Sequence, residues 1–194
     1  MTDALNIVVV EPDRERAIEI VDALRAQGRH DVLVLGDATG LARRIASRAP
    51  DLVLVDAGDP SRDAIEDLAL ATGPLERPVA LFVDRSPEGA ARAAAEAGVA
   101  AYVAGGLDPA RLLPVLEAAI ARWTVGRRLR DELAETRRAL EERKVIDRAK
   151  GLLMKARGLD EAAAYALLRR TAMDRGRRVA DVAAALVDAA DLLS

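Results

Sequence analysis

Short runs of Val, Ile, Leu and Ala alternate with longer segments of helical periodicity over the first part of the chain. The runs are residues 7–10, 32–35, 52–55, 79–83 and 100–103. They are continuously apolar instead of alternating, as in parallel strands that helices cover on both faces. The pattern predicts an α/β domain over residues 1–122, a doubly wound (βα)5 sheet whose ligand sites lie at the carboxyl ends of its strands.

The pattern becomes helical from residue 109 onward. Leu129, Leu133, Thr136 and Leu140 follow one another at spacings of 4, 3 and 4, which predicts a short coiled-coil seam in a linker helix over residues 123–144. About two heptads is a short run, so a helix packed within the chain is the alternative. Gly126 is the expected point of flexibility between the two domains.

The remaining residues, 145–194, divide at two glycines into three helical segments. Gly158 and Gly176 are suited to the positive φ that follows a helix end, and Asp160 can cap the second segment. We therefore expect an all-α domain of three helices, with its first helix beginning near residue 145.

Composition narrows the class of protein. The chain has no cysteine, one histidine and few aromatic residues, which argues against disulfides, cysteine chemistry, histidine metal clusters and histidine-based catalytic triads. No apolar run is long enough to span a bilayer, and the first residues lack the pattern of a signal peptide. We expect a cytoplasmic protein that does not engage a membrane.

The charge is divided unevenly along the chain. Up to Val125 there are 13 Lys and Arg against 20 Asp and Glu, a net charge of −7, whereas the rest has 16 against 12, a net charge of +4. A basic segment behind an acidic body favours a polyanionic partner for the second part only. The alternative is a helical surface that is merely solvated.

Acidic residues follow several of the predicted strands. Glu11 and Asp13 follow the first, Asp56 the third and Asp84 the fourth. Glu11, Asp13 and Asp56 predict a possible Mg²⁺ site, because this ion prefers carboxylate oxygens, and Asp56 could then accept a phosphoryl group. No other cofactor is expected.

Residues 6–122 resemble a response-regulator receiver domain, with Asp56 at the place of its phosphoacceptor aspartate. The match is incomplete. Pro12 follows Glu11 where the family has a second acid, Val83 stands where it has Ser or Thr, and Gly105 or Gly106 where it has Lys. We expect an atypical receiver that is poorly phosphorylated, and the alternative for Asp56 is a polar strand end or helix cap.

Two motifs in the last third carry a more specific resemblance. The runs AKGLLM at residues 149–154 and AYALLRRTAM at residues 164–173, with a basic turn before the last helix, resemble the ANTAR domain. That domain is the three-helix RNA-binding module of AmiR and NasR type transcription antitermination regulators. Residues 5–193 as a whole are similar to the NasT-like nitrate-assimilation regulators.

The resemblance implies a function. A regulator of this family binds paired small hairpins in a nascent leader transcript and so prevents a terminator hairpin from forming. It implies a homodimer that joins two RNA sites, and a nitrate- or nitrite-sensing protein as controlling partner. Carried over residue by residue, it implies an RNA-contacting face made of Ala149, Lys150, Gly151, Met154, Arg169, Arg170, Met173, Arg177 and Arg178.

Other interpretations stay open at this point. Met154 and Met173 could be core residues, as apolar residues at helical spacing often are, and the arginines could belong to a solvated surface. A DNA-binding response regulator shares the receiver-plus-basic-helices layout, although these helical segments are long for a helix-turn-helix. A hub that binds only proteins would fit the acidic net charge. An enzyme is disfavoured, because the chain has no nucleophile and base pair or phosphate-binding loop.

Overall fold

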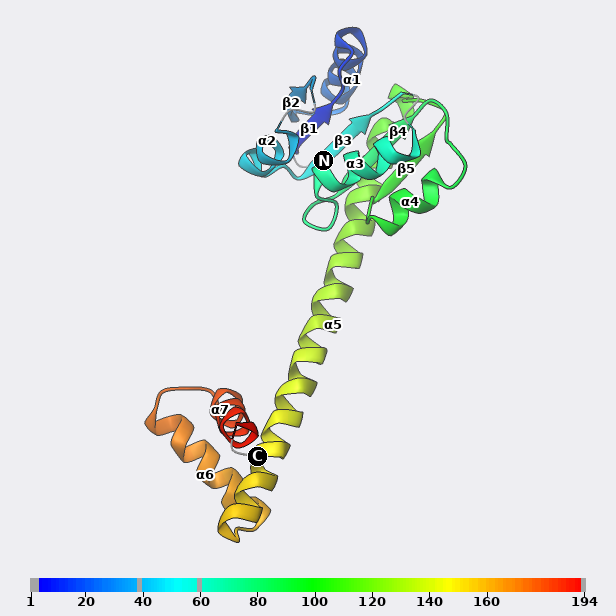
Figure 1. Ribbon diagram of the computed structural model, residues 1–194. Coiled ribbons are helices and arrows are strands. Elements are labelled where there is room, and N and C mark those ends of the chain that lie inside the picture. Colours follow the sequence, from blue (N-terminus) through cyan, green and yellow to red (C-terminus); the bar gives the residue numbers. More distant parts are fainter. Residues whose placement is uncertain (1–3, 38–39, 59–60, 193–194) are drawn as a thin grey trace. The chain divides into compact units, whose positions relative to one another are not determined.

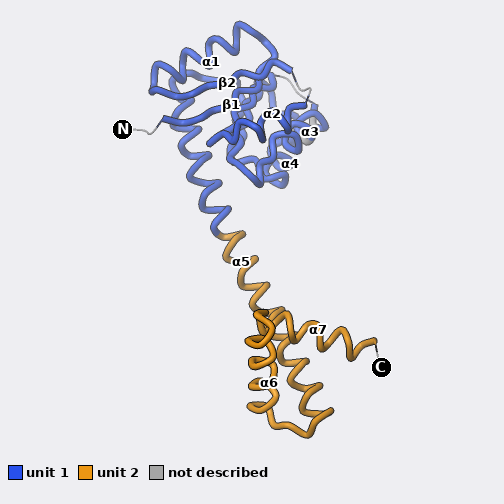
Figure 2. Tube along the Cα trace, turned by 90° about the vertical axis from the view of Figure 1, so that its left-hand side faces the viewer, with its two compact units in different colours: residues 1–128 blue, residues 129–194 orange. Residues whose placement is uncertain are grey.

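The computed structural model describes residues 4–37, 40–58 and 61–192. The chain divides into two compact units, Met1–Arg128 and Leu129–Ser194 (Figure 2). Each unit is described below by itself.

The first unit is a parallel sheet covered by helices (Figure 1). Its elements are β1 (Asn6–Val10), α1 (Arg14–Gln27), β2 (Asp31–Leu35), α2 (Leu41–Arg48), β3 (Leu52–Asp56), α3 (Arg62–Thr72), β4 (Val79–Val83), α4 (Ala90–Glu96), β5 (Ala101–Ala104) and the start of α5 (Pro109–Arg157). The strand order is β2-β1-β3-β4-β5, with every neighbouring pair parallel. The predicted doubly wound (βα)5 sheet is confirmed, and each strand end lies within one residue of its predicted position.

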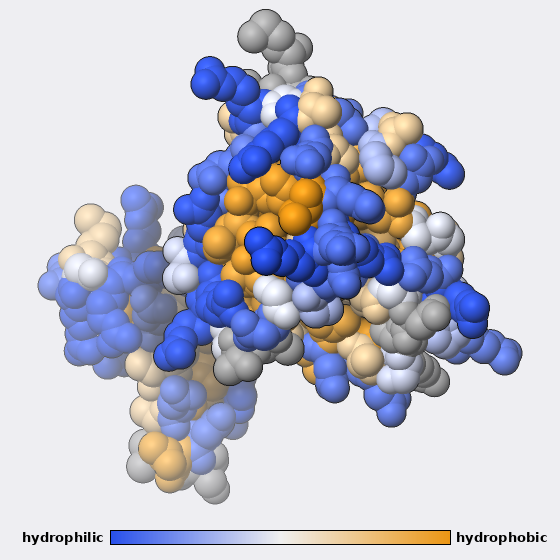
Figure 3. Space-filling model, turned by 90° about the horizontal axis from the view of Figure 1, so that it is seen from above, coloured by the Kyte–Doolittle hydropathy of each residue, from blue (hydrophilic) through white to orange (hydrophobic). Residues whose placement is uncertain are grey.

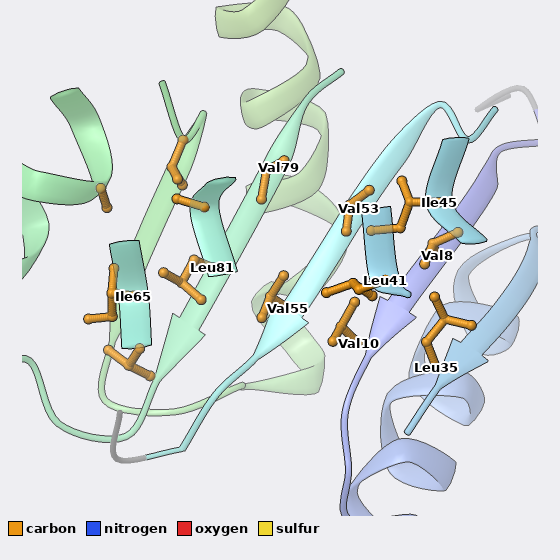
Figure 4. Close-up of a cluster of buried hydrophobic side chains, with 14 of the residues drawn as sticks. Val8, Val10, Leu35, Leu41, Ile45, Val53, Val55, Ile65, Val79 and Leu81 are labelled. Atoms are coloured by element: carbon orange, nitrogen blue, oxygen red, sulfur yellow. The ribbon is translucent and has the colours of Figure 1, made fainter. Parts of the chain in front are cut away.

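Alternate residues of the strands supply two separate cores. Val8 and Val53 point into a cluster with residues of α2, α3 and α4 such as Ile45, which Figure 4 shows in detail. Their neighbours along the strands, such as Ile7 and Leu52, pack instead with α1 and the start of α5. Period-two alternation in a strand that is buried on both faces therefore sends every second side chain to the opposite layer.

The edge strands differ from this pattern. The strands β1, β3 and β4 are almost fully buried, but β2 and β5 are partly exposed. Leu33 in β2 and Ile18 in α1 remain open to solvent. Figure 3 shows hydrophobic residues gathered on one face of the first unit and bordered by hydrophilic ones. The expectation that every strand is buried was wrong for β2 and β5. Each lies at an edge of the sheet, with a neighbouring strand on one side only, so its other side is open to solvent.

Helix α5 runs through the whole predicted linker segment, residues 123–144. It continues from Pro109 to Arg157, so the predicted boundaries at residues 122 and 144 both lie inside it, and so does Gly126. The segment around residue 144 contains no helix breaker, and Lys144 pairs with Glu141 at 2.8 Å. One interior glycine costs a helix only about 1 kcal/mol relative to alanine, which does not end it. The first helix of the predicted three-helix domain is thus the last part of α5.

The apolar stripe of the coiled-coil segment faces solvent. Leu129, Leu133 and Leu140 are 60%, 51% and 52% exposed. The stripe is therefore not part of the hydrophobic core of the second unit.

The second unit is completed by α6 (Glu161–Asp174) and α7 (Val179–Asp191). The turns before these helices contain Gly158 at φ 66° and Gly176 at φ 59°, the left-handed conformation that the sequence predicts. The Asp160 carboxylate accepts a hydrogen bond from the Ala163 amide at 2.7 Å, which confirms the predicted cap. Small residues such as Ala164 and Ala183 are fully buried, so the helices approach one another closely. Among the helices in the described part of the chain, none has an apolar stretch that could cross a membrane.

Candidate phosphoacceptor pocket and nucleic-acid interface

Three acidic side chains meet at the carboxyl edge of the sheet. Asp56 is the last residue of β3, Glu11 follows β1, and Asp84 follows β4. The three strands are adjacent and parallel, so their ends bring these carboxylates together. Glu11 and Asp56 are each only 3% exposed, whereas Asp84 is on the surface. The structure thus gathers the predicted phosphoacceptor with two further acids.

An arginine from α1 lies among these acids. The Arg16 Nη2 atom is 2.8 Å from Asp56 Oδ2 and its Nη1 atom is 3.0 Å from Asp84 Oδ2. Its Nε atom donates to Asp56 Oδ2 at 3.2 Å and lies 3.6 Å from Glu11 Oε2. The guanidinium therefore neutralises charge that three carboxylates would otherwise concentrate at one edge.

Asp13 does not join the cluster. Its carboxylate accepts hydrogen bonds at 2.9 Å from the amides of Glu15 and Arg16 and so caps the first turn of α1. The predicted magnesium-ligand set of Glu11, Asp13 and Asp56 is not formed. Within the described ranges, no three His, Cys, Asp or Glu side chains are placed to hold a metal ion. Asp13 caps the N-terminus of α1, so its carboxylate is not available as the metal ligand that the sequence pattern predicted.

The pocket shifts proton affinities in opposite directions. Burial raises the pKa of Glu11, the Asp56 charge adds to this, and a hydrogen bond from the Asp13 amide opposes it. One oxygen of this carboxylate, Oε2, accepts no hydrogen bond in the described structure. The hydrogen bond from Arg16 lowers the pKa of Asp84 instead. Asp84 is thus stabilised in its charged form, whereas Glu11 is destabilised in its charged form.

The positions that depart from the receiver pattern lie at the same carboxyl edge of the sheet. Val83, where the family has a hydroxyl, is fully buried at the end of β4. Gly105 and Gly106 follow β5, and their amides donate to the Val83 carbonyl at 3.0 Å. Gly106 has a φ of 81°, and a Cβ atom there would lie 3.1 Å from Asp84 Oδ1. The glycine lets Asp84 turn toward Arg16.

The second unit places the predicted RNA-contacting residues unequally. Ala149 is fully buried in the core, so its prediction as a surface contact was wrong. Lys150 has a side chain only 15% exposed, and its Nζ atom lies 2.7 Å from Asp147 and 2.6 Å from Glu161. Its ammonium joins α5 to α6, and a contact with RNA would require these pairs to break.

The remaining residues of the AKGLLM and AYALLRRTAM motifs are on the surface. Met154 is 38% exposed and Met173 is 72% exposed, so the interpretation of both as core residues was wrong. Gly151 is exposed in α5, and a Cβ atom there would have no neighbour within 4 Å. No packing constraint inside the domain therefore requires a glycine at this position.

The arginines of the second unit divide into paired and unpaired ones. Arg148 pairs with Asp191 at 2.6 Å, and Arg178 pairs with Glu142. Apart from Arg143, which lies 4.0 Å from Asp147, the other arginines of this unit make no salt bridge with any described residue. Three lie in the coiled-coil segment, Arg130, Arg137 and Arg138, and five lie further along the chain, Arg157, Arg169, Arg170, Arg175 and Arg177.

Three of the unpaired arginines line one hollow of the second unit. The hollow has a volume of about 380 Å³, and Arg157, Arg175 and Arg177 line it together with apolar residues such as Leu167 and Leu186. Arg157 and Arg175 are absent from the set that the motif implied. The sequence could have indicated them because each directly precedes a glycine that ends a helix, Arg157 before Gly158 and Arg175 before Gly176. The arginines next to both turns line this hollow.

Comparisons with known proteins bear on both units. The ANTAR domain family matches residues 134–187. The transcriptional regulatory protein PdtaR of Mycobacterium tuberculosis is 30% identical over 180 residues, 91% of this chain and 88% of that protein. The nitrate regulatory protein of Klebsiella oxytoca is 44% identical over 59 residues, which are 30% of this chain but 15% of that protein.

A solved structure agrees with the fold of the first unit. The CheY-like response-regulator receiver domain protein of Methanospirillum hungatei aligns at a TM-score of 0.52 and 16% identity, over 64% of this chain and 99% of that one. At this identity the likeness shows the fold alone. Because the match to PdtaR extends over both units and the ANTAR match lies in the second, the chain belongs to the ANTAR-domain response regulators.

Proposed function

We propose that this protein is a transcription antitermination regulator whose second unit binds paired hairpins in nascent leader RNA. The observation that carries the proposal is the group of arginines without a salt-bridge partner in the described chain, which includes Arg157, Arg175 and Arg177 around one hollow. Guanidinium groups bind phosphate in two-pronged geometry, and RNA loops present clustered phosphates beside unstacked bases.

The surface around these arginines has the apolar component that loop recognition needs. Exposed Met154 and Met173 offer flexible, polarisable contacts, and Gly151 leaves the backbone of α5 open to close approach. We assign the RNA-contacting face to these residues with Arg169, Arg170 and the arginines of the hollow. Ala149 is not part of it, and Lys150 supports it from the interior of the α5 and α6 junction.

A homodimer formed through the coiled-coil segment is the second part of the proposal. The exposed Leu129, Leu133 and Leu140 would be covered by the same stripe of a second copy, as in a coiled-coil seam. Two linked RNA sites would then act on two hairpins at an effective concentration that reaches about millimolar. Paired hairpins would therefore bind much more tightly than one.

The proposed biological role is control of nitrate or nitrite assimilation genes, with a nitrate- or nitrite-sensing protein as regulatory partner. Support for this role is the similarity to the nitrate regulatory protein of Klebsiella oxytoca, which covers 59 residues. The receiver-like unit is the proposed site of control, and its parallel-sheet fold leaves the partly exposed strands β2 and β5 as edges that a partner can use. We propose a cytoplasmic, non-enzymatic regulator.

The experiment that tests the function is a binding titration followed by fluorescence anisotropy. The full chain is added to a labelled RNA with two tandem hairpins, to the same RNA with one hairpin deleted, and to duplex DNA of matched length. The proposal expects tight binding to the tandem RNA, weaker binding to one hairpin, and the weakest binding to DNA. Equal or tighter binding to DNA would place the protein among promoter-binding regulators, and no binding to any of the three would favour a role in protein contacts only.

A further inference from the structure

The acidic edge of the first unit holds a cation that the chain itself supplies. We propose that the Arg16 guanidinium is the resident cation of this pocket, and that it takes the place of the Mg²⁺ that the acidic residues of the sequence predict there. On this basis Glu11, Asp56 and Asp84 do not take up Mg²⁺ in the native protein. The proposal concerns the first unit and does not rest on RNA binding by the second.

The contacts of Arg16 use the oxygens that a metal would need. Its Nε and Nη2 atoms both donate to Asp56, at 3.2 and 2.8 Å, and its Nη1 and Nη2 atoms donate to Asp84, at 3.0 and 3.2 Å. Mg²⁺ demands octahedral oxygen coordination at about 2.0–2.1 Å. An ion between the same carboxylates would overlap the guanidinium and be repelled by its charge. Metal and arginine therefore exclude each other.

The burial of Glu11 indicates that a cation is needed at this place. Glu11 is 3% exposed, and its Oε2 atom has no hydrogen-bond partner within the described structure, with the Arg16 Nε atom 3.6 Å away. Two nearly buried acids, Glu11 and Asp56, would be costly side by side without a compensating positive charge. The guanidinium supplies that charge.

The position of Arg16 in its helix makes the arrangement stable. The Asp13 cap fixes the first turn of α1, and the Arg16 amide is one of the two donors to that cap. One turn later on the same side of the helix, Ile20 is 1% exposed in the core. Packing of α1 therefore holds the base of the Arg16 side chain over the strand ends, and the fork of the guanidinium needs little further ordering.

A covalently attached cation has a consequence for control. A guanidinium stays charged at every physiological pH and cannot be removed by a change in metal concentration. Asp56 also accepts three hydrogen bonds from it, which engage the oxygens that an incoming phosphoryl group would have to approach. The first unit is therefore kept in one state, independent of metal and phosphoryl donors.

The test measures Mn²⁺ binding to the full chain by electron paramagnetic resonance, and thermal unfolding with and without Mg²⁺. The variants are Arg16→Met, which keeps the apolar stem but removes the charge, and Arg14→Met, which changes an exposed arginine of the same helix. Wild type and Arg14→Met should bind no Mn²⁺ at this pocket and show no Mg²⁺ effect on unfolding. Arg16→Met should bind Mn²⁺ with an affinity at least roughly tenfold above the detection limit that wild type fails to reach, because an opposing unit charge at contact distance has been removed.

Several results would overturn the proposal. Wild-type binding of one Mn²⁺ that Asp56→Asn abolishes would show that arginine and metal coexist, and this arm needs no arginine variant to fold. A folded Arg16→Met protein that binds no more Mn²⁺ than wild type would show that Arg16 does not stand in for a metal. An equal gain of binding in Arg14→Met would show that only the overall charge matters.

Discussion

Replacement of Gly151 by alanine separates the stability of the second unit from its RNA binding. Gly151 lies inside α5, is exposed, and has open space where a Cβ atom would lie. Alanine is favoured over glycine in a helix interior by about 0.8–1 kcal/mol. The free energy of unfolding of the second unit should therefore rise by roughly that amount, since no clash offsets the gain.

The same methyl group should weaken RNA binding. If the RNA backbone lies against α5 at Gly151, a methyl group there moves a phosphate away from a neighbouring arginine and removes that contact. Loss of one hydrogen bond to a charged group costs about 1.5–3 kcal/mol, which is more than tenfold in affinity. We expect Gly151→Ala to be more stable and to bind tandem-hairpin RNA more than tenfold less tightly.

The assay combines urea unfolding, followed by circular dichroism, with the anisotropy titration. Ala166→Gly, at an exposed position of α6, is the matched control for helix propensity and should be destabilised by a similar amount. A destabilised Gly151→Ala protein would refute the open geometry around this residue. A stabilised one with unchanged RNA affinity would remove Gly151 from the proposed face.

Two further predictions concern the dimer and the acidic pocket. Leu133→Asp should shift the protein from dimer to monomer in sedimentation velocity and reduce its preference for tandem over single hairpins; a variant that stays dimeric would contradict the proposed seam. The raised pKa of Glu11 means that the folded state holds this proton more tightly than the unfolded state, so its contribution to stability is present at acid pH and is lost as the pH rises above 4.5 through the folded pKa. Glu11→Gln should therefore gain stability relative to wild type between pH 4 and pH 7 in urea unfolding. A difference in free energy of unfolding between the two proteins that does not change with pH would contradict the pKa shift.

The fold was largely predictable because its signal is local. Runs of branched apolar residues define buried parallel strands, and Asp160, Gly158 and Gly176 mark helix ends by their own backbone chemistry. The boundary expected near residue 144 was not predictable in this way. Both sides of it favour a helix, and the sequence alone does not tell one long helix from two that meet.

The sites were less predictable because their partners are distant in sequence. Arg16 binds Asp56 and Asp84, which follow it by 40 and 68 residues, and nothing nearby distinguishes it from the other arginines of its helix. A motif match also does not say what a residue contacts. Ala149 and Lys150 belong to the same run as exposed Met154, yet one is in the core and the other is held in an ion-pair bridge.

The most direct test of the central claim is the salt dependence of RNA affinity for wild type and for the variant Arg157→Gln, Arg175→Gln, Arg177→Gln. Each phosphate contact contributes about −0.7 to the log–log slope of affinity against salt for single-stranded nucleic acid. If these arginines bind phosphates, the variant should bind tandem-hairpin RNA more weakly, with a slope shallower by roughly 2, while its helical content stays unchanged. An unchanged slope and affinity in the folded variant would contradict the assignment of this face to RNA.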